Sequence, residues 1–196
     1  MKQDVLLVTD MQNDFIHNEG AYGRAGRWLP SNRAVIENLI KLTDTFREHG
    51  QFIISAQFTI IANKDNKALL PDGQKEKLPF LIRGDFQQGR WGHQLIDELG
   101  PADYTINRIF SSAFKMTHLE WLLSKLGAKR LFVAGLNIDN SMFATLKSAK
   151  KKGFECALIS NAWNAHDEKE ALLKSVQELG VASHATQDVL ATIGSK

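Results

Sequence analysis

The chain has 196 residues, of which 43% are hydrophobic, and this is typical of one compact domain spanning residues 1–196. Its 24 Lys and Arg residues nearly balance 22 Asp and Glu residues, which argues against a broad surface for nucleic acid or a membrane. The single cysteine, Cys156, excludes a disulfide framework and a thiolate metal site. No signal peptide or membrane-spanning apolar stretch is recognised, so we expect a soluble, cytoplasmic protein.

Strands and helices alternate along the first half of the chain. A continuous apolar run over residues 5–9 predicts a strand buried on both faces. A polar loop over residues 16–30 follows, and then a helix with Ser31 as its N-cap, whose apolar residues recur at helical spacing up to Phe46. A second strand is predicted over residues 52–57. The loop of about thirty residues after it is long enough to be functional or a lid.

The second half continues the alternation. The predicted elements are a short helix over 91–99, a strand over 103–106, a helix from a capping box at Thr117 to 126, a strand over 131–134, a helix over 140–152, a strand over 156–159, a helix capped by Asp167 and ending at 180, a strand over 181–185 and a terminal helix. This order predicts a three-layer α/β/α sandwich with a mainly parallel, Rossmann-like sheet of about six strands.

Polar residues lie where several of these strands end. Asp10 follows the first strand, Gln57 ends the second, and Arg108 follows the strand over 103–106. Ser141 lies in the first turn of the helix after residues 131–134, whose N-terminal amides could bind an anion. Because open α/β sheets bind ligands at the carboxyl ends of their strands, we expect Asp10, Arg108 and Ser141 to meet in one pocket.

Three motifs resemble the isochorismatase-like (cysteine hydrolase) superfamily in their order and spacing. They are DMQNDF at residues 10–15, SAF at residues 112–114 and GLNIDNS at residues 135–141. The resemblance implies a three-layer α/β hydrolase that forms a homo-oligomer, a dimer or tetramer, and acts on a small amide or carbamoyl compound or on the vinyl ether of isochorismate. The segment GRWG at residues 89–92 is more similar to the amide-hydrolysing branch.

The same resemblance places Asp10, Arg108 and Ser141 at the positions of the amidases' Asp-Lys-Cys triad. Arginine keeps the positive charge of lysine but stays protonated, so it cannot move a proton. A serine needs a competent general base, whereas a thiol is ionised readily. We expect Arg108 to depress the pKa of Asp10 and make it a poor base. The covalent amidase mechanism is therefore not expected here.

Isochorismate-cleaving members offer a second precedent. They also lack the cysteine, rely on the aspartate for protonation, and carry an Ala-Gln pair like Ala56-Gln57, although they keep the lysine. Two function classes stay open. One is a hydrolase of a small, anionic molecule with Asp10 as acid or base; the other is a catalytically inactive member that serves as a small-molecule-binding or regulatory module. Loop arginines favour an anionic ligand in either case: Arg24, Arg27, Arg83 and Arg90.

The remaining expectations concern substrate contacts, backbone strain and metal. The predicted substrate-binding residues are Phe15, Gln57, Trp91, Leu136 and Asn137, with Trp91 as a substrate lid or an oligomer contact. The family commonly has a non-proline cis peptide before the nucleophile turn, which would fall here between Leu136 and Asn137. The nicotinamidase zinc site needs histidines after the second strand, and residues 58–61 (FTII) supply none. We therefore predict no metal and no cofactor.

Overall fold

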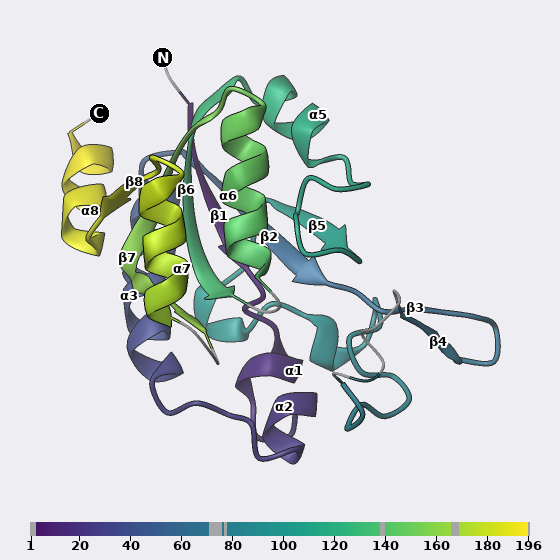
Figure 1. The fold of residues 1–196 in the computed structure, drawn as a ribbon. Helices are drawn as coiled ribbons and strands as arrows, with labels where there is room; N and C mark the ends of the chain where they lie inside the picture. The colour runs from purple at the N-terminus through teal and green to yellow at the C-terminus, as the bar shows by residue number, and fades with distance from the viewer. Residues whose placement is uncertain (1–2, 71–75, 77, 138–139, 166–168, 196) are drawn as a thin grey trace.

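The computed structural model describes residues 3–70, 76, 78–137, 140–165 and 169–195. These residues form a six-stranded parallel sheet with the order β5-β2-β1-β6-β7-β8, which confirms the predicted α/β fold (Figure 1). The strands are β1 (Gln3–Thr9), β2 (Phe52–Phe58), β5 (Tyr104–Arg108), β6 (Ala128–Asn137), β7 (Glu155–Ala165) and β8 (Ala182–His184). Parallel strands need crossover connections, and helices supply most of them.

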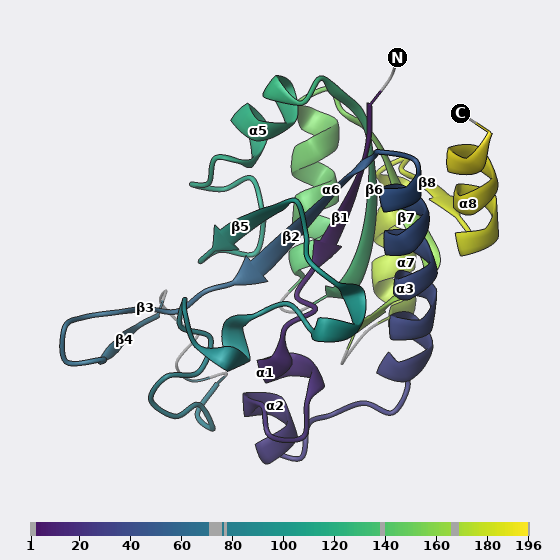
Figure 2. The ribbon, with the colours of Figure 1, turned by 180° about the vertical axis from the view of Figure 1, so that it is seen from behind.

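Helices cover both faces of this sheet. On one face lie α3 (Asn32–Glu48) and α8 (Thr186–Gly194), seen from the front in Figure 2. On the other face lie α5 (Leu119–Lys125), α6 (Ser141–Lys151) and α7 (Lys169–Glu178) (Figure 1). The centre of the sheet is therefore enclosed, and its carboxyl edge is the place where polar side chains can gather.

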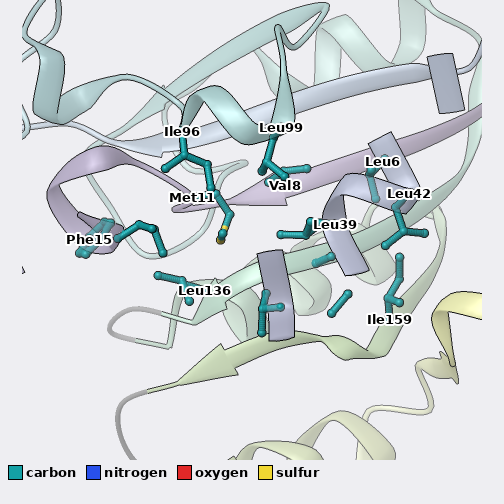
Figure 3. Packing of buried hydrophobic residues seen from close by; sticks show 14 of the residues in the cluster. Leu6, Val8, Met11, Phe15, Leu39, Leu42, Ile96, Leu99, Leu136 and Ile159 are labelled. Atoms are coloured by element: carbon teal, nitrogen blue, oxygen red, sulfur yellow. The ribbon is translucent and has the colours of Figure 1, made fainter. Parts of the chain in front are cut away.

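Strand β1 is buried on both faces, as its continuous apolar run predicts. Leu6 and Val8 belong to the core under α3, whereas Val5 and Leu7 belong to the core under α5, α6 and α7. Figure 3 shows Leu39 and Leu42 of α3 in the first of these cores. Because alternate side chains of a strand point to opposite faces, only an uninterrupted apolar sequence satisfies both cores.

Two segments differ from their sequence-based predictions. The predicted loop over residues 16–30 contains the short helix α2 (Ala21–Arg24), and another unpredicted short helix, α1 (Asn13–Ile16), leads into it. The predicted helix over 91–99 is instead two 3-10 turns, η1 (Trp91–His93) and η2 (Asp97–Leu99). Its backbone pairs with the chain after β1: the amide of residue 13 donates to the carbonyl of residue 94 (3.0 Å), and that of residue 96 to residue 11 (3.0 Å). These long-range bonds replace helical ones.

Several boundaries also differ. Strand β7 reaches Ala165 rather than residue 159. Its pairing with β6 shifts in register between Val133 and Gly135 and then resumes, with Gly135 opposite Trp163. Ser31 lies at the N-cap position of α3, but its side chain makes no capping hydrogen bond. Its backbone is already helical, and its hydroxyl accepts a hydrogen bond from Asn164 Nδ2 at 2.7 Å instead. The hydroxyl of Thr117 accepts from the Leu119 amide, and α5 begins only at Leu119. The predicted cap at Asp167 lies outside the described residues.

The long loop after β2 contains a small hairpin, formed by β3 (Ile61–Ala62) and β4 (Ala68–Leu69). It extends away from the body of the molecule in both Figure 1 and Figure 2.

Within the described part of the chain, no helix combines the length and the apolar character needed to cross a membrane.

Candidate active site

Asp10 lies at the point where β1 ends at the carboxyl edge of the sheet. Its backbone is left-handed (φ +57), and its amide donates to the carbonyl of Ala56 at 2.9 Å. Asp is among the few non-glycine residues that adopt this conformation readily. The turn carries the chain off the sheet while the Asp10 carboxylate stays fully buried.

The structure brings Asp10, Arg108 and Ser141 together. Arg108 Nη2 donates to both carboxylate oxygens of Asp10, at 2.5 Å each, and Ser141 Oγ donates to Asp10 Oδ2 at 2.8 Å. The three residues come from the ends of β1 and β5 and from the start of α6. None is more than 2% exposed. A buried carboxylate needs such partners, because an unpaired charge out of water is costly.

Arg108 is fixed by contacts on several sides. Its Nη1 donates to the carbonyl of Phe110 at 2.9 Å, and its guanidinium lies 5.6 Å from the centre of the Phe58 ring. Its Nε is buried without a hydrogen-bond partner among the described residues. The fixed guanidinium can hold and stabilise the Asp10 carboxylate, but it cannot take part in proton transfer.

A close contact between β6 and β1 positions Ser141. Gly135 has φ +113, and a Cβ at this position would lie 2.2 Å from the carbonyl oxygen of Thr9. The Thr9 hydroxyl in turn donates to the carbonyls of Ala134 and Leu136 at 3.1 and 2.9 Å. These contacts place the start of α6 beside Asp10. Residues 138 and 139 of this motif lie outside the described part of the chain.

Burial raises the pKa of Asp10 above its ordinary value, although the charge of Arg108 and the hydrogen bonds from Arg108 and Ser141 act in the opposite direction. The expectation that Asp10 has a depressed pKa is therefore wrong, because burial outweighs the effect of Arg108. Its physical reason is desolvation, because the carboxylate is completely removed from water. A carboxyl group with a raised pKa is a better proton acceptor, and it is also more readily available as a proton donor.

The five predicted substrate-binding residues lie in different surroundings. Phe15 is buried in an aromatic cluster, with its ring centre 4.8 Å from that of Tyr22. Leu136 is a core residue. Trp91 is 45% exposed, and its ring centre lies 5.3 Å from that of His17. Their substrate contacts stay predictions.

Asn137 and Gln57 complete this set. The Asn137 side chain accepts from the amide of Met142 at 2.9 Å and so holds the first turn of α6. Gln57 is buried and lines a separate cavity that is described below. The described peptide bonds include no cis bond, so the predicted cis peptide between Leu136 and Asn137 is wrong. Both residues instead continue β6 and pair with residues 164 and 165 of β7.

The loop arginines are not all available to a ligand. Arg24 Nη2 pairs with both carboxylate oxygens of Asp85, at 2.7 and 2.8 Å, and the Arg27 guanidinium lies 4.8 Å from the centre of the Phe80 ring. Arg83 and Arg90 are exposed.

Two buried polar residues near the site were not singled out from the sequence. The Asp14 carboxylate accepts from the amides of Ala21 (3.0 Å) and Phe86 (2.6 Å), and burial raises its pKa. A Cβ on Gly92 would lie 2.2 Å from Asp14 Oδ2, so the GRWG segment packs directly on this carboxylate. The only sequence signal was the presence of Asp14 in the DMQNDF motif and of Gly92 in GRWG.

His93 is the second of these residues. Its Nε2 lies 2.8 Å from Thr59 Oγ1, and burial lowers its pKa to about 4. His93 is therefore neutral at pH 7. Within the residues that the structure describes, no group of three or more His, Cys, Asp or Glu side chains could hold a metal ion.

The family of this chain follows from comparison with known proteins. Residues 4–188 match the model of the isochorismatase domain. The chain belongs to the isochorismatase family. It is 27% identical over 157 residues to a probable inactive nicotinamidase of Arabidopsis thaliana, an alignment that covers 76% of this chain and 73% of that relative.

This isochorismatase-family chain is also similar to a second sequence relative and to a solved structure. It is 27% identical over 161 residues to the ureidoacrylate amidohydrolase RutB of Klebsiella pneumoniae subsp. pneumoniae, covering 74% of this chain and 66% of that relative. Its fold is similar to that of N-carbamoylsarcosine amidase from Thermoplasma acidophilum, with a TM-score of 0.74, 21% identity, and coverage of 94% of this chain and 96% of that one.

Proposed function

We propose that this isochorismatase-family protein hydrolyses a small, anionic molecule with Asp10 as the acid or base and without a covalent enzyme intermediate. The observation that carries the proposal is the buried Asp10 carboxylate, which has a raised pKa and is held between the Arg108 guanidinium and the Ser141 hydroxyl. The substrate classes are a carbamoyl compound or amide and an isochorismate-like vinyl ether. The raised pKa favours the vinyl ether, because its hydrolysis begins with proton donation.

In this reaction, the protonated Asp10 donates its proton to the vinyl carbon of the substrate. Water then adds to the resulting oxocarbenium carbon and returns a proton to Asp10, and the hemiketal breaks down to a ketone and an alcohol. For a carbamoyl substrate, Asp10 instead accepts a proton from the attacking water and passes it to the leaving nitrogen. In both cases Arg108 orients Asp10, and Ser141 holds one carboxylate oxygen through its hydrogen bond.

A second candidate is a catalytically inactive family member that binds a small molecule. The specific observation for it is that Asp10, Arg108 and Ser141 are buried and satisfy one another, as a structural ion pair would. One relative is itself named a probable inactive nicotinamidase.

We further propose that the protein is a cytoplasmic homo-oligomer. Large apolar side chains on its surface support self-association, since they are candidates for burial in a subunit interface: Trp28, Ile61, Leu69, Ile82, Trp91, Met116 and Trp121. Sedimentation analysis of the purified protein tests the oligomeric state.

Kinetics with two anionic compounds, isochorismate and ureidoacrylate, test the proposed reaction. We expect turnover of at least one of them, isochorismate first, and a fall in kcat of about 100-fold or more in Asp10→Asn. An exposed acid, Asp44→Asn, is the matched control and should keep full activity. If both compounds stabilise the wild type and Asp10→Asn equally in a thermal shift assay while neither is turned over, the inactive candidate is correct.

A further inference from the structure

A second cavity, of about 540 Å³, lies at the edge of the sheet formed by β2 and β5. Its lining combines Gln57 and Thr105 from these strands with the chain that contains η1 and η2, residues 93–97 and 100–102. Gln57 and His93 are 5% and 4% exposed, whereas Asp97 and Thr105 are exposed. The buried residues thus form its inner end and the exposed ones its mouth. The volume is within the range of about 300–1,000 Å³ that is usual for small-molecule pockets.

This cavity and the Asp10 cluster have different lining residues. Gln57 and Ile53 are four residues apart on β2, and alternation along the strand places both on the face that packs under α3. Gln57 pairs in register with Asn107 of β5. Asp10, Arg108 and Ser141 are not among the described residues that line the cavity.

Several polar groups on this face have no partner. The side-chain amide of Gln57 makes no hydrogen bond to any other described residue, and although the residue as a whole is only 5% exposed, its amide atoms are not among the fully buried polar atoms. This amide is therefore open to the cavity that Gln57 lines. Ser55 Oγ and Asn107 Oδ1 are buried and unpaired in the described part of the chain, but neither residue lines the cavity. By contrast, the nearby amide of Gln12 is fully bonded, to the carbonyls of Phe58 and His93 and to the Phe58 amide. A side-chain amide that has no protein partner and lines a cavity is available for hydrogen bonds with a ligand there.

The charges of the lining define the ligand. No Lys or Arg is among the lining residues described, and the acid Asp97 lies at the mouth. His93 is neutral, and its Nε2 is occupied by Thr59. Arg47 lies beside the cavity, because its Nη2 donates to the Pro101 carbonyl at 3.1 Å, but this guanidinium is bonded to the carbonyls of residues 99 and 101 and is not among the described lining residues. A buried cation would find Asp97, the only carboxylate among the described lining residues, at the solvent edge. The inner end therefore suits an uncharged polar group.

We propose that this cavity binds an uncharged nitrogen heterocycle whose edge carries a hydrogen-bond donor next to an acceptor, as an aminopurine does. The Gln57 amide offers an acceptor and a donor side by side, which is the arrangement that pairs with the N6 and N7 edge of adenine. The apolar side chains of Leu95, Ile96, Pro101 and Ala102 provide surface for the faces of a flat ring. This site is separate from the one in the proposed reaction.

Titration of the ¹⁵N-labelled protein with adenosine, followed by NMR, tests this inference. We expect saturable shifts of the Gln57 side-chain amide and of the backbone amides over residues 93–102. Gln57→Leu and the ligand N6,N6-dimethyladenosine, which lacks the N6 donors, should each weaken binding about ten-fold or more. AMP should bind no more tightly than adenosine, because none of the described residues that line the cavity is Lys or Arg. Asp10→Asn should leave adenosine binding unchanged.

Gln57→Glu and Thr105→Ala serve as second variants if Gln57→Leu does not fold, and both should weaken binding. The inference is overturned if adenosine causes no saturable shift, if its affinity is the same in the Gln57 and Thr105 variants, or if the shifts are confined to residues around Asp10 and Ser141. Loss of hydrolysis in Asp10→Asn has no bearing on this result, so the two sites are tested independently.

Discussion

At Asp10, burial and charge pairing act on one carboxyl group in opposite directions. The guanidinium of Arg108 and the hydroxyl of Ser141 favour the ionised form, while complete removal from water favours the protonated form and outweighs them. The residue types alone suggested a poor base. The structure instead gives Asp10 a raised pKa, which is the property that an acid or base near neutral pH needs.

The proposal that Arg108 and Ser141 stand where the family's amidases carry lysine and cysteine can be tested by introducing those two residue types. Wild-type protein should turn over nicotinamide, biuret or N-carbamoylsarcosine slowly at most, by attack of water that Asp10 activates, because Ser141 does not supply a thiolate. The double variant Ser141→Cys with Arg108→Lys should gain measurable amidase turnover, and Asp10→Asn in that background should remove it. Steady-state kinetics measure both effects. An inert double variant would mean that the shape of the pocket has also changed, and ordinary turnover by the wild type would refute the argument from serine.

Gly135 provides a test of the contact that positions Ser141. In Gly135→Ala the new Cβ would meet the Thr9 carbonyl, so we expect a loss of about 3 kcal/mol or more in the free energy of unfolding. Gly153 is a matched control, since its φ of +84 is also positive but a Cβ there would meet nothing within 4 Å. Gly153→Ala should cost only about 1 kcal/mol. Equal losses in urea denaturation would show that the Thr9 contact is unimportant.

Among the elements, α1, α2 and η1 are held together by one buried carboxylate, that of Asp14. Asp14 of α1 accepts from the first residue of α2 and from the amide of Phe86, and Gly92 of η1 packs against it. Neither α1 nor α2 is long enough to be stable by itself. Their conformation therefore depends on contacts that join residues far apart in the sequence.

Replacing this carboxylate should loosen the whole group of segments. Asp14→Ala leaves two buried amides without an acceptor, and we expect it to cost about 2 to 4 kcal/mol in unfolding free energy. The control is Asp44→Ala, which removes an exposed ion pair with Arg47 and should cost less than about 1 kcal/mol. Chemical denaturation measures both. Similar small losses in the two variants would contradict the anchoring role of Asp14.

At the scale of the whole molecule, the buried histidine makes stability depend on pH. His93 has a folded-state pKa of about 4 against an ordinary value of 6.5, so between these values the unfolded chain binds more protons than the folded one. Its contribution to stability is fully present above pH 6.5 and is lost as the pH falls toward 4. The loss from this group is at most about 3 kcal/mol, since each pKa unit corresponds to about 1.4 kcal/mol.

Comparison with His93→Gln isolates this contribution. Asp10 and Asp14, whose pKa values are raised, act with the opposite sign, because their folded forms bind protons more readily as the pH falls. We therefore expect the wild type to lose more unfolding free energy than His93→Gln between pH 7 and pH 4.5. Urea denaturation at a series of pH values provides the measurement. Parallel curves for the two proteins would show that His93 titrates normally.

The sequence alone determined the α/β order and predicted that Asp10, Arg108 and Ser141 meet, as their hydrogen bonds show that they do. Both rest on local patterns: an apolar run such as residues 5–9 has only one way to satisfy two cores, and short motifs keep their spacing. The tertiary structure decided the rest. It broke the predicted helix over 91–99 by pairing it with residues 11–13, and it placed Gln57 in a cavity away from Asp10. It also reversed the expected pKa shift of Asp10. Burial and long-range hydrogen bonds cause these three results, and both depend on residues that are distant in the sequence.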